Sequence, residues 1–132
     1  MSKIIIVDDH LTFRKGLHLM LKEIQEVKEI AECENGLQFL SQVEQISPDL
    51  VFMDIRLPGM SGIEAAVKAL KQNSNLRIII LTMFGEEKYL KEAMEAGVKG
   101  FLLKPPTLFQ LRVAYQTVMQ DKLYFPTELR CQ

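Results

Sequence analysis

Cysteine is scarce in this chain of 132 residues, where only Cys33 and Cys131 occur. The two lie far apart, form no Cys-x-x-Cys pair and have no cysteine or histidine at metal-binding spacing. A disulfide scaffold is therefore excluded, and we interpret both thiols as structurally incidental. Their scarcity favours a reducing compartment, the cytoplasm, over secretion.

Long apolar runs are also missing. Segments such as Ile4 to Val7 are far shorter than the roughly 20 residues that span a bilayer, and they are too short for the apolar part of a signal peptide. We therefore expect a soluble protein with no membrane partner.

The chain has no excess of one charge sign, since 16 basic and 17 acidic residues leave a formal charge of −1 at pH 7. This balance gives no electrostatic basis for direct binding to DNA or to an anionic membrane. A hydrophobic content of 48% and a charged content of 25% match ordinary globular proteins and exclude a disordered or collagen-like chain. A chain of this length is expected to form a single domain.

Five short apolar segments alternate with five segments of helical periodicity. The predicted strands are 4–7, 27–31, 50–53, 78–81 and 98–103, and the predicted helices lie at about 13–24, 37–46, 63–70, 86–96 and 107–121. Strands that do not alternate between apolar and polar residues are typical of a parallel sheet buried on both faces. The pattern predicts an α/β fold, a doubly wound (βα)5 five-stranded parallel sheet of flavodoxin-like architecture.

In the first predicted helix, an apolar stripe runs from Phe13 to Ile24. Arg14 and Lys15 are expected on other faces of that helix. In the last predicted helix, Thr107 is expected to be the N-cap, and Gly97 is expected to end the helix before it.

Polar side chains follow four of the predicted strands. Asp8 and Asp9 follow the first, Asp54 the third, Thr82 the fourth and Lys104 the fifth. Ligands of open α/β sheets bind beyond the carboxyl ends of the strands, where the strand order switches. We therefore expect three carboxylates, a hydroxyl and an ammonium to converge at one edge of the sheet.

Converging carboxylates repel one another unless a proton or a cation compensates them. Ligands that offer only oxygen favour Mg²⁺ or Mn²⁺, and Mg²⁺ is usually held together with a phosphate. A carboxylate can attack phosphorus while a lysine and a metal neutralise the transferring oxygens. Asp54 is the better candidate nucleophile, because the adjacent pair Asp8 and Asp9 suits metal binding.

Four segments together resemble the receiver domain of bacterial two-component response regulators. They are Val7 to His10, Met53 to Gly62, Leu81-Thr82 and Gly100 to Pro105. The resemblance covers about residues 2–121 in order and spacing. Segments 13–17 and 59–65 more narrowly resemble the NarL/LuxR-type subfamily, whose members usually carry a C-terminal helix-turn-helix.

The resemblance implies that Asp54 accepts a phosphoryl group from the phosphohistidine of a sensor histidine kinase. Asp54 would also belong to the metal site, where Asp9 binds Mg²⁺ directly and Asp8 binds it mainly through water. The backbone carbonyl of Arg56 would complete the protein ligands. A bulky pair, Arg56 and Phe84, would flank the path of the water that hydrolyses the acyl phosphate.

The resemblance also assigns a phosphate-binding and switch group. Lys104 would pair with the phosphoryl oxygens, Thr82 would move to bind the phosphate, and Phe101 would swing inward behind it. The bond between Lys104 and Pro105 would be cis. Such a domain is a phosphoacceptor that slowly hydrolyses its own acyl phosphate, and it is not a turnover enzyme.

The expected organisation is a receiver domain at 1–121 followed by a tail at 122–132, which could begin a linker to an output domain absent from this sequence. DNA would then be bound only through that output domain, to control transcription, and the receiver could form a homodimer. Two alternatives stay open, a stand-alone receiver that signals by docking and a pseudo-receiver that acts without phosphorylation.

Other interpretations assign these residues less specific roles. Asp8 and Asp9 could cap the N-terminus of the first helix, where carboxylates interact favourably with the helix dipole, and Asp54 could belong to a turn. Thr82 could simply end a strand, Phe101 could be core packing, and both His10 and His18 are expected at the surface. A haloacid-dehalogenase-type phosphatase would need an acid in place of Arg56. In a flavodoxin-like electron carrier, the two aspartates after the first strand would repel a flavin phosphate.

Overall fold

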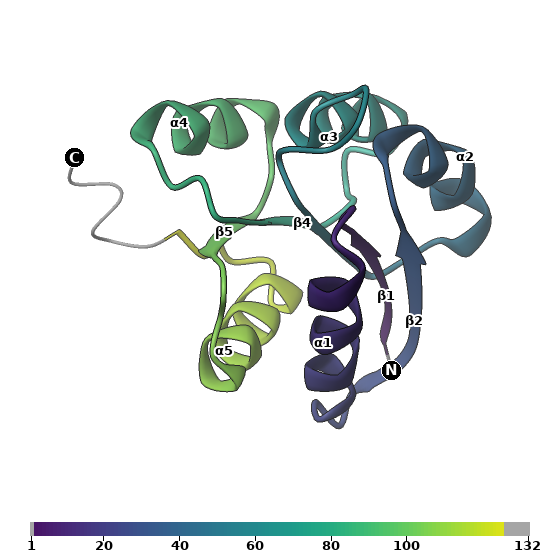
Figure 1. The fold of residues 1–132 in the computed structure, drawn as a ribbon, viewed down its shortest axis with the longest axis vertical. Helices are drawn as coiled ribbons and strands as arrows, with labels where there is room; N and C mark the ends of the chain where they lie inside the picture. The colour runs from purple at the N-terminus through teal and green to yellow at the C-terminus, as the bar shows by residue number, and fades with distance from the viewer. Residues whose placement is uncertain (1, 126–132) are drawn as a thin grey trace.

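The computed structural model describes residues 2–125 as a parallel sheet of five strands with helices on both faces (Figure 1). Along the chain the elements are β1 (Ser2–Val7), α1 (Leu11–Lys22), β2 (Val27–Cys33), α2 (Gly36–Ile46), β3 (Leu50–Met53), α3 (Gly62–Gln72), β4 (Ile78–Thr82), α4 (Glu87–Ala96), β5 (Gly100–Leu103) and α5 (Leu108–Met119). The strand order is β2-β1-β3-β4-β5. This is the flavodoxin-like order, so the predicted fold class is confirmed. None of the helices within residues 2–125 combines the length and the apolar character that a membrane span requires.

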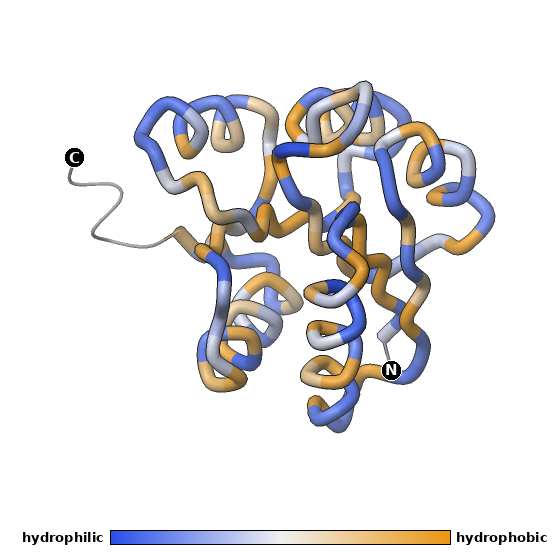
Figure 2. Tube along the Cα trace, in the orientation of Figure 1, coloured by the Kyte–Doolittle hydropathy of each residue, from blue (hydrophilic) through white to orange (hydrophobic). Residues whose placement is uncertain are grey.

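Alternate residues of each central strand enter two separate cores. On β1, Ile5 packs beneath α2, α3 and α4, whereas Ile4 and Ile6 pack against α1 and α5. Both faces of the sheet are covered, which explains why the central strands β3 and β4 read as uninterrupted, buried runs. Figure 2 shows this distribution, with mostly orange tube along the central strands and alternating blue and orange stretches along the outer helices.

The ends of the helices follow local capping chemistry. Thr107 is the N-cap of α5, and it forms a capping box with Gln110. Gly97 ends α4 with a left-handed backbone at φ 97°. Both of these predictions are confirmed.

Four strand boundaries differ from those predicted. β1 begins at Ser2 rather than Ile4, β4 ends at Thr82 rather than at residue 81, and the other two differences have a cause in hydrogen bonding. β2 continues to Cys33 rather than ending at residue 31, because Glu32 and Cys33 still pair with the end of β1. β5 begins at Gly100 rather than at Val98, because the Val98 N–H bonds back to the Ala93 carbonyl of α4. Both differences arise from hydrogen bonds between segments that a local sequence pattern does not reveal.

The chain that follows α5 covers the open edge of β5. Tyr124 forms a parallel bridge with Gly100, and its carbonyl accepts a hydrogen bond of 2.9 Å from the Phe101 N–H. A Cβ on Gly100 would lie 3.2 Å from the Tyr124 carbonyl oxygen, so glycine permits this close approach. A domain boundary at residue 121 stays a prediction, and residues 126–132 of the predicted tail lie outside the described part of the chain.

Candidate functional site

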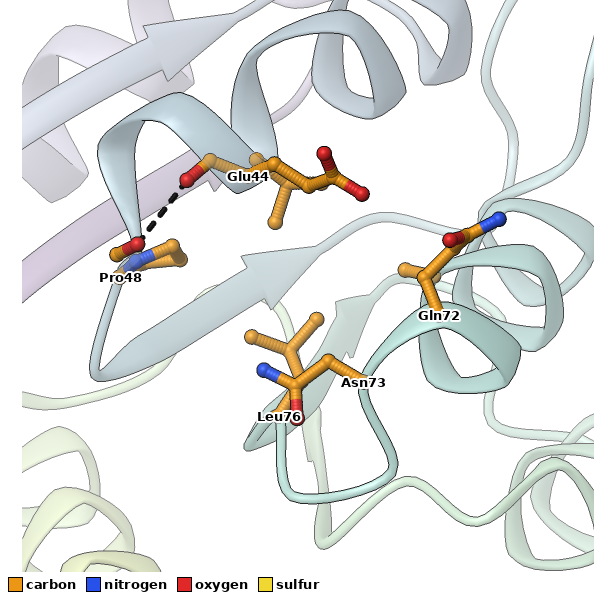
Figure 3. Close-up of a pocket in the computed structure, with 8 residues that line it drawn as sticks. Glu44, Pro48, Gln72, Asn73 and Leu76 are labelled. Atoms are coloured by element: carbon orange, nitrogen blue, oxygen red, sulfur yellow. Dashed lines mark hydrogen bonds between the residues drawn. The ribbon is translucent and has the colours of Figure 1, made fainter.

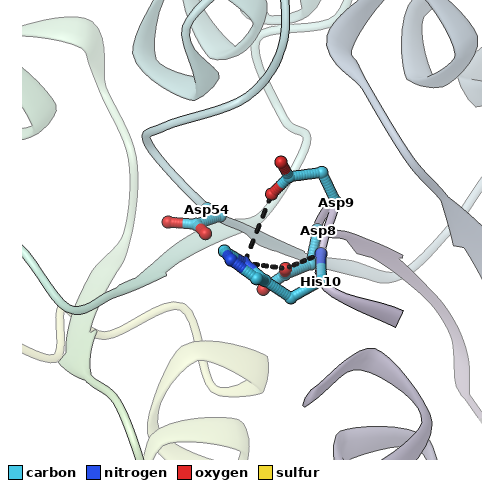
Figure 4. Close-up of side chains that lie close together, drawn as sticks. All are labelled: Asp8, Asp9, His10 and Asp54. Atoms are coloured by element: carbon cyan, nitrogen blue, oxygen red, sulfur yellow. Dashed lines mark hydrogen bonds and ion pairs between the residues drawn. The ribbon is translucent and has the colours of Figure 1, made fainter. Parts of the chain in front are cut away.

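The polar residues that follow β1 and β3 meet at the carboxyl edge of the sheet. One ligand atom from each of Asp8, Asp9, His10 and Asp54 lies within 4.8 Å of the others (Figure 4). β1 and β3 are neighbours in the centre of the sheet, where the strand order switches. Asp8 and Asp54 are buried, whereas Asp9 and His10 are exposed at the rim.

Lys104 reaches this cluster from the end of β5. Its Nζ lies 2.6 Å from Asp8 Oδ2 and 2.8 Å from Asp54 Oδ2, and only 5% of its side chain is exposed. Burial alone would lower the pKa of Lys104, but hydrogen bonds to Asp54 and Asp8 outweigh burial and raise that pKa. Lys104 therefore remains an ammonium at neutral pH, and the Phe13 ring covers it at 4.3 Å from Nζ to the ring centroid.

The charges at this edge do not balance. The carboxylates Asp8, Asp9 and Asp54 face a single lysine, Lys104, so about two negative charges remain uncompensated. Carboxylate oxygens are the ligands that Mg²⁺ and Mn²⁺ prefer, and a divalent cation carries the missing charge. The residues present therefore fit such an ion.

The carboxylate of Asp54 is held by two hydrogen bonds. Oδ1 accepts a hydrogen bond of 2.7 Å from the backbone N–H of Ile55, and Oδ2 accepts one from Lys104 Nζ. The loop after Asp54 is pinned because the N–H of Gly62 donates to the Ile55 carbonyl at 2.8 Å. Gly62 also packs directly against the Asp54 carbonyl, where a Cβ would lie only 1.7 Å from the oxygen.

Asp8 does not act as a helix cap. His10 is the N-cap of α1 without a capping side-chain bond, and the first turn of α1 contains no acidic residue. Asp8 Oδ1 accepts from the N–H of His10 at 2.8 Å, while Oδ2 binds Lys104. The His10 ring is exposed, as expected, but its Nδ1 lies 3.4 Å from Asp9 Oδ1 and 3.5 Å from Asp8 Oδ1. Its position directly after the two aspartates is the sequence signal for this proximity.

The predicted switch residues lie in or beside the core. Thr82 is fully buried, and its Oγ1 accepts a hydrogen bond of 3.2 Å from the N–H of Phe84. Phe101 is fully buried in the core beneath α2, α3 and α4, so the structure leaves both its switch role and its packing role open. The peptide bond between Lys104 and Pro105 is cis, as predicted.

The side chain of Arg56 lies over an aromatic pair. Its guanidinium carbon is 4.1 Å from the centroid of the Phe84 ring, and Nη2 donates to Tyr89 Oη at 3.3 Å. Phe84 and Tyr89 themselves meet edge to face. The role of the Arg56 backbone carbonyl as a metal ligand stays a prediction.

A second network of charged residues is centred on Glu32. Glu32, near the end of β2, accepts hydrogen bonds from Arg14 at 2.8 Å, Lys15 at 3.1 Å and His18 at 2.7 Å. Arg14 is buried, although its helix position suggested a face away from the core. Burial alone would raise the pKa of Glu32, but these three hydrogen bonds lower that pKa.

This shift predicts an acid-sensitive contribution to stability. A carboxyl with a lowered folded-state pKa stabilises the protein above its ordinary pKa of 4.5, and that contribution is lost as the pH falls through the folded value. Glu32→Gln should therefore lower the free energy of unfolding at pH 7, and the difference from wild type should shrink as the pH is lowered from 7 to below 4.5. Urea unfolding across this range measures the difference, and a constant gap would contradict the assignment.

A groove of about 220 Å³ lies between α2 and α3 (Figure 3). Its lining includes Glu44, Pro48, Gln72 and Asn73. Pro48 and Leu76 precede β3 and β4, so the groove lies at the amino ends of the strands and away from the acidic edge. It takes no part in the chemistry of the acidic cluster.

The strand order and the acidic edge with its lysine define the class of CheY-like receiver folds. The family model described as the response regulator receiver domain matches residues 4–116, and the chain belongs to this family. A receiver domain is not a typical turnover enzyme.

Curated relatives and a solved structure identify the NarL/LuxR type. The chain is 41% identical to the transcriptional regulatory protein YdfI of Bacillus subtilis, over 79% of this chain and 48% of YdfI. It is 34% identical to the oxygen regulatory protein NreC of Staphylococcus epidermidis, over 96% of this chain and 59% of NreC. A LuxR-family two-component response regulator from Aurantimonas sp. SI85-9A1 superposes with a TM-score of 0.93 at 26% identity, covering 99% of this chain and 94% of that one. The chain spans about half the length of the first curated relatives that it matches.

Proposed function

We propose that this chain is the phosphorylation-controlled receiver of a two-component pathway and that Asp54 is the phosphoacceptor. The observation that carries the proposal is the setting of the Asp54 carboxylate, which is buried among acidic neighbours and 2.8 Å from Lys104 Nζ. The donor would be the phosphohistidine of a sensor histidine kinase, in the cytoplasm.

In the proposed reaction, a carboxylate oxygen of Asp54 attacks phosphorus. The bond from phosphorus to the histidine nitrogen breaks as the bond to Asp54 forms, and the departing imidazole keeps the electron pair. Asp8, Asp9, Asp54 and the backbone carbonyl of Arg56 would hold Mg²⁺ or Mn²⁺. Such an ion, when bound, neutralises charge on the phosphoryl oxygens.

Lys104 and Thr82 would bind the oxygens of the phosphoryl group once it is on Asp54. The Lys104 ammonium now binds Asp54 Oδ2, and it would transfer that hydrogen bond to a phosphoryl oxygen. Thr82 Oγ1 accepts a bond from Phe84, which leaves its own hydroxyl proton free to be donated to the phosphate. Movement of Thr82 and of Phe101 would then alter the surface formed by α4, β5 and α5.

The output of the switch is proposed to be transcriptional. YdfI is named a transcriptional regulatory protein, and this chain matches about half of it. DNA would be bound through an output domain, since the net charge of −1 gives this chain no excess of positive charge. The altered surface would act by forming a homodimer or by releasing the output domain.

Incubation with acetyl phosphate tests the proposal without a kinase. We expect intact-mass spectrometry to show a single phosphate adduct that needs Mg²⁺ and is absent from Asp54→Asn. The matched control is Asp49→Asn, a partly buried aspartate that accepts a hydrogen bond from the Lys3 N–H at the opposite, amino end of the strands. If no condition produced an adduct, the pseudo-receiver alternative would replace this proposal.

The pair formed by Arg56 and Phe84 is expected to prolong the phosphorylated state. Their stacked side chains would obstruct the water that attacks the acyl phosphate, so the double variant Arg56→Ala/Phe84→Ala should lose phosphate several-fold faster. The decay of the adduct after removal of acetyl phosphate gives the half-life. The control is Phe109→Ala on α5, and an unchanged half-life in the double variant would contradict the shielding role.

A further inference from the structure

Arg14 is a buried charge outside the ligand set proposed above. It lies in the first turns of α1, and only 6% of the residue is exposed. A buried guanidinium is costly unless hydrogen bonds and an opposite charge compensate it. The partners of Arg14 therefore indicate what this residue does.

Arg14 joins the acidic edge to the neighbouring strand. Its Nη1 donates a hydrogen bond of 2.6 Å to the backbone carbonyl of Asp8. Its Nε donates one of 2.8 Å to Oε1 of Glu32, which lies near the end of β2. Glu32 is fixed in turn by Lys15 and His18. The guanidinium of Arg14 therefore binds Glu32 through Nε and the Asp8 backbone through Nη1.

The Asp8 backbone is held from both sides. The Asp8 N–H donates a hydrogen bond of 3.0 Å to the carbonyl of Cys33, and the Asp8 carbonyl accepts one from Arg14. The carbonyl of Asp8 and the N–H of Asp9 belong to one planar peptide, so fixing this carbonyl also fixes where the Asp9 side chain leaves the backbone. Both contacts come from outside the acidic cluster, from α1 and from the end of β2.

We propose that Arg14 is a positioning residue that orients Asp8 and Asp9 for a divalent cation, with Glu32 as its anchor. This inference rests on the proposed function, because the cation is part of that function. Partners that orient metal ligands typically change affinity by about 10- to 100-fold when they are removed. A loss of this size is expected when Arg14 can no longer bind the Asp8 carbonyl.

Binding of Mn²⁺ alone, followed by electron paramagnetic resonance on the full chain, measures this effect without any phosphorylation. We expect Arg14→Met to weaken Mn²⁺ binding by about 10-fold or more, and Arg14→Lys, which keeps a donor, to restore part of it. The matched control is Lys22→Met, because Lys22 is an exposed lysine at the opposite end of the same helix. Its affinity should equal that of the wild type.

The double variant Arg14→Met/Glu32→Met separates positioning from folding. It removes both partners of the buried pair, so neither is left as an unpaired buried charge, and thermal unfolding reports its stability. A folded double variant that still binds Mn²⁺ weakly supports positioning. Wild-type affinity in folded Arg14→Met or in the folded double variant would overturn the inference.

The wild type distinguishes this failure from failure of the proposed function. If the wild type itself bound no Mn²⁺, both the metal site and the inference would fall. If the wild type bound Mn²⁺ and the Arg14 variants bound it equally, the inference alone would fall. At saturating Mg²⁺ the labelling of Arg14→Met by acetyl phosphate should return to near the wild-type rate, because the variant lacks no group that touches phosphorus.

Discussion

Replacing Lys104 with methionine is expected to slow labelling by acetyl phosphate by about 10²- to 10³-fold, the usual effect of removing one group that stabilises transition-state charge. The ammonium contacts both Asp8 and Asp54, and it is the group expected to follow the charge onto the phosphoryl oxygens. A time course of adduct formation at saturating Mg²⁺ gives the rate. Labelling at the wild-type rate would exclude Lys104 from the reaction.

The same variant should make stability depend on the divalent ion. Without Lys104, the buried carboxylates of Asp8 and Asp54 lose their partner, and breaking a buried pair costs about 3–5 kcal/mol. Mg²⁺ should restore much of this loss, so thermal unfolding of Lys104→Met is expected to shift with Mg²⁺ more than that of the wild type. Lys88→Met, which removes an exposed lysine over the Tyr89 ring, is the control.

Gly62→Ala is expected to be the most damaging of the possible glycine-to-alanine substitutions. The added Cβ would lie 1.7 Å from the Asp54 carbonyl oxygen and 2.9 Å from Met53 Cγ, so the backbone itself must move. Overpacking costs about 1–3 kcal/mol, occasionally more, and we expect a loss of at least about 3 kcal/mol here. The forced shift occurs at Asp54, so labelling should fall as well.

Gly16→Ala is the matched control for this effect. Gly16 lies within α1, and a Cβ there would meet nothing within 4 Å. Alanine should therefore stabilise the helix by about 0.5–1 kcal/mol. Urea unfolding of both variants measures the difference, and equal stabilities would contradict the close packing of Gly62.

The fold and the acidic edge are predictable from the sequence for a specific physical reason. The strands other than β2 are largely buried on both faces and therefore read as short apolar runs. The residue that ends each of these runs lies at the same edge of the sheet as its counterparts. Asp8, Asp54, Thr82 and Lys104 all occupy such ends. Their meeting follows from topology, without any knowledge of side-chain contacts.

Two sets of long-range contacts, those of Arg14 and those of Tyr124, could not be predicted from the sequence. Arg14 has a helix position that suggested an outward face, and only the register between β1 and β2 brings Glu32 beside it. The pairing of Tyr124 with β5 likewise depends on where the chain returns after α5. These contacts join segments far apart in the sequence, and periodicity carries no information about them.

Trapping the acyl phosphate with borohydride tests the central claim most directly. Borohydride reduces an aspartyl phosphate to homoserine, so peptide mass spectrometry identifies the carboxylate that carried the phosphoryl group. After incubation with acetyl phosphate and Mg²⁺, we predict homoserine at position 54 and unaltered aspartate at positions 8 and 9. Homoserine at position 8 or 9, or at none of the three, would contradict the assignment of Asp54 as the phosphoacceptor.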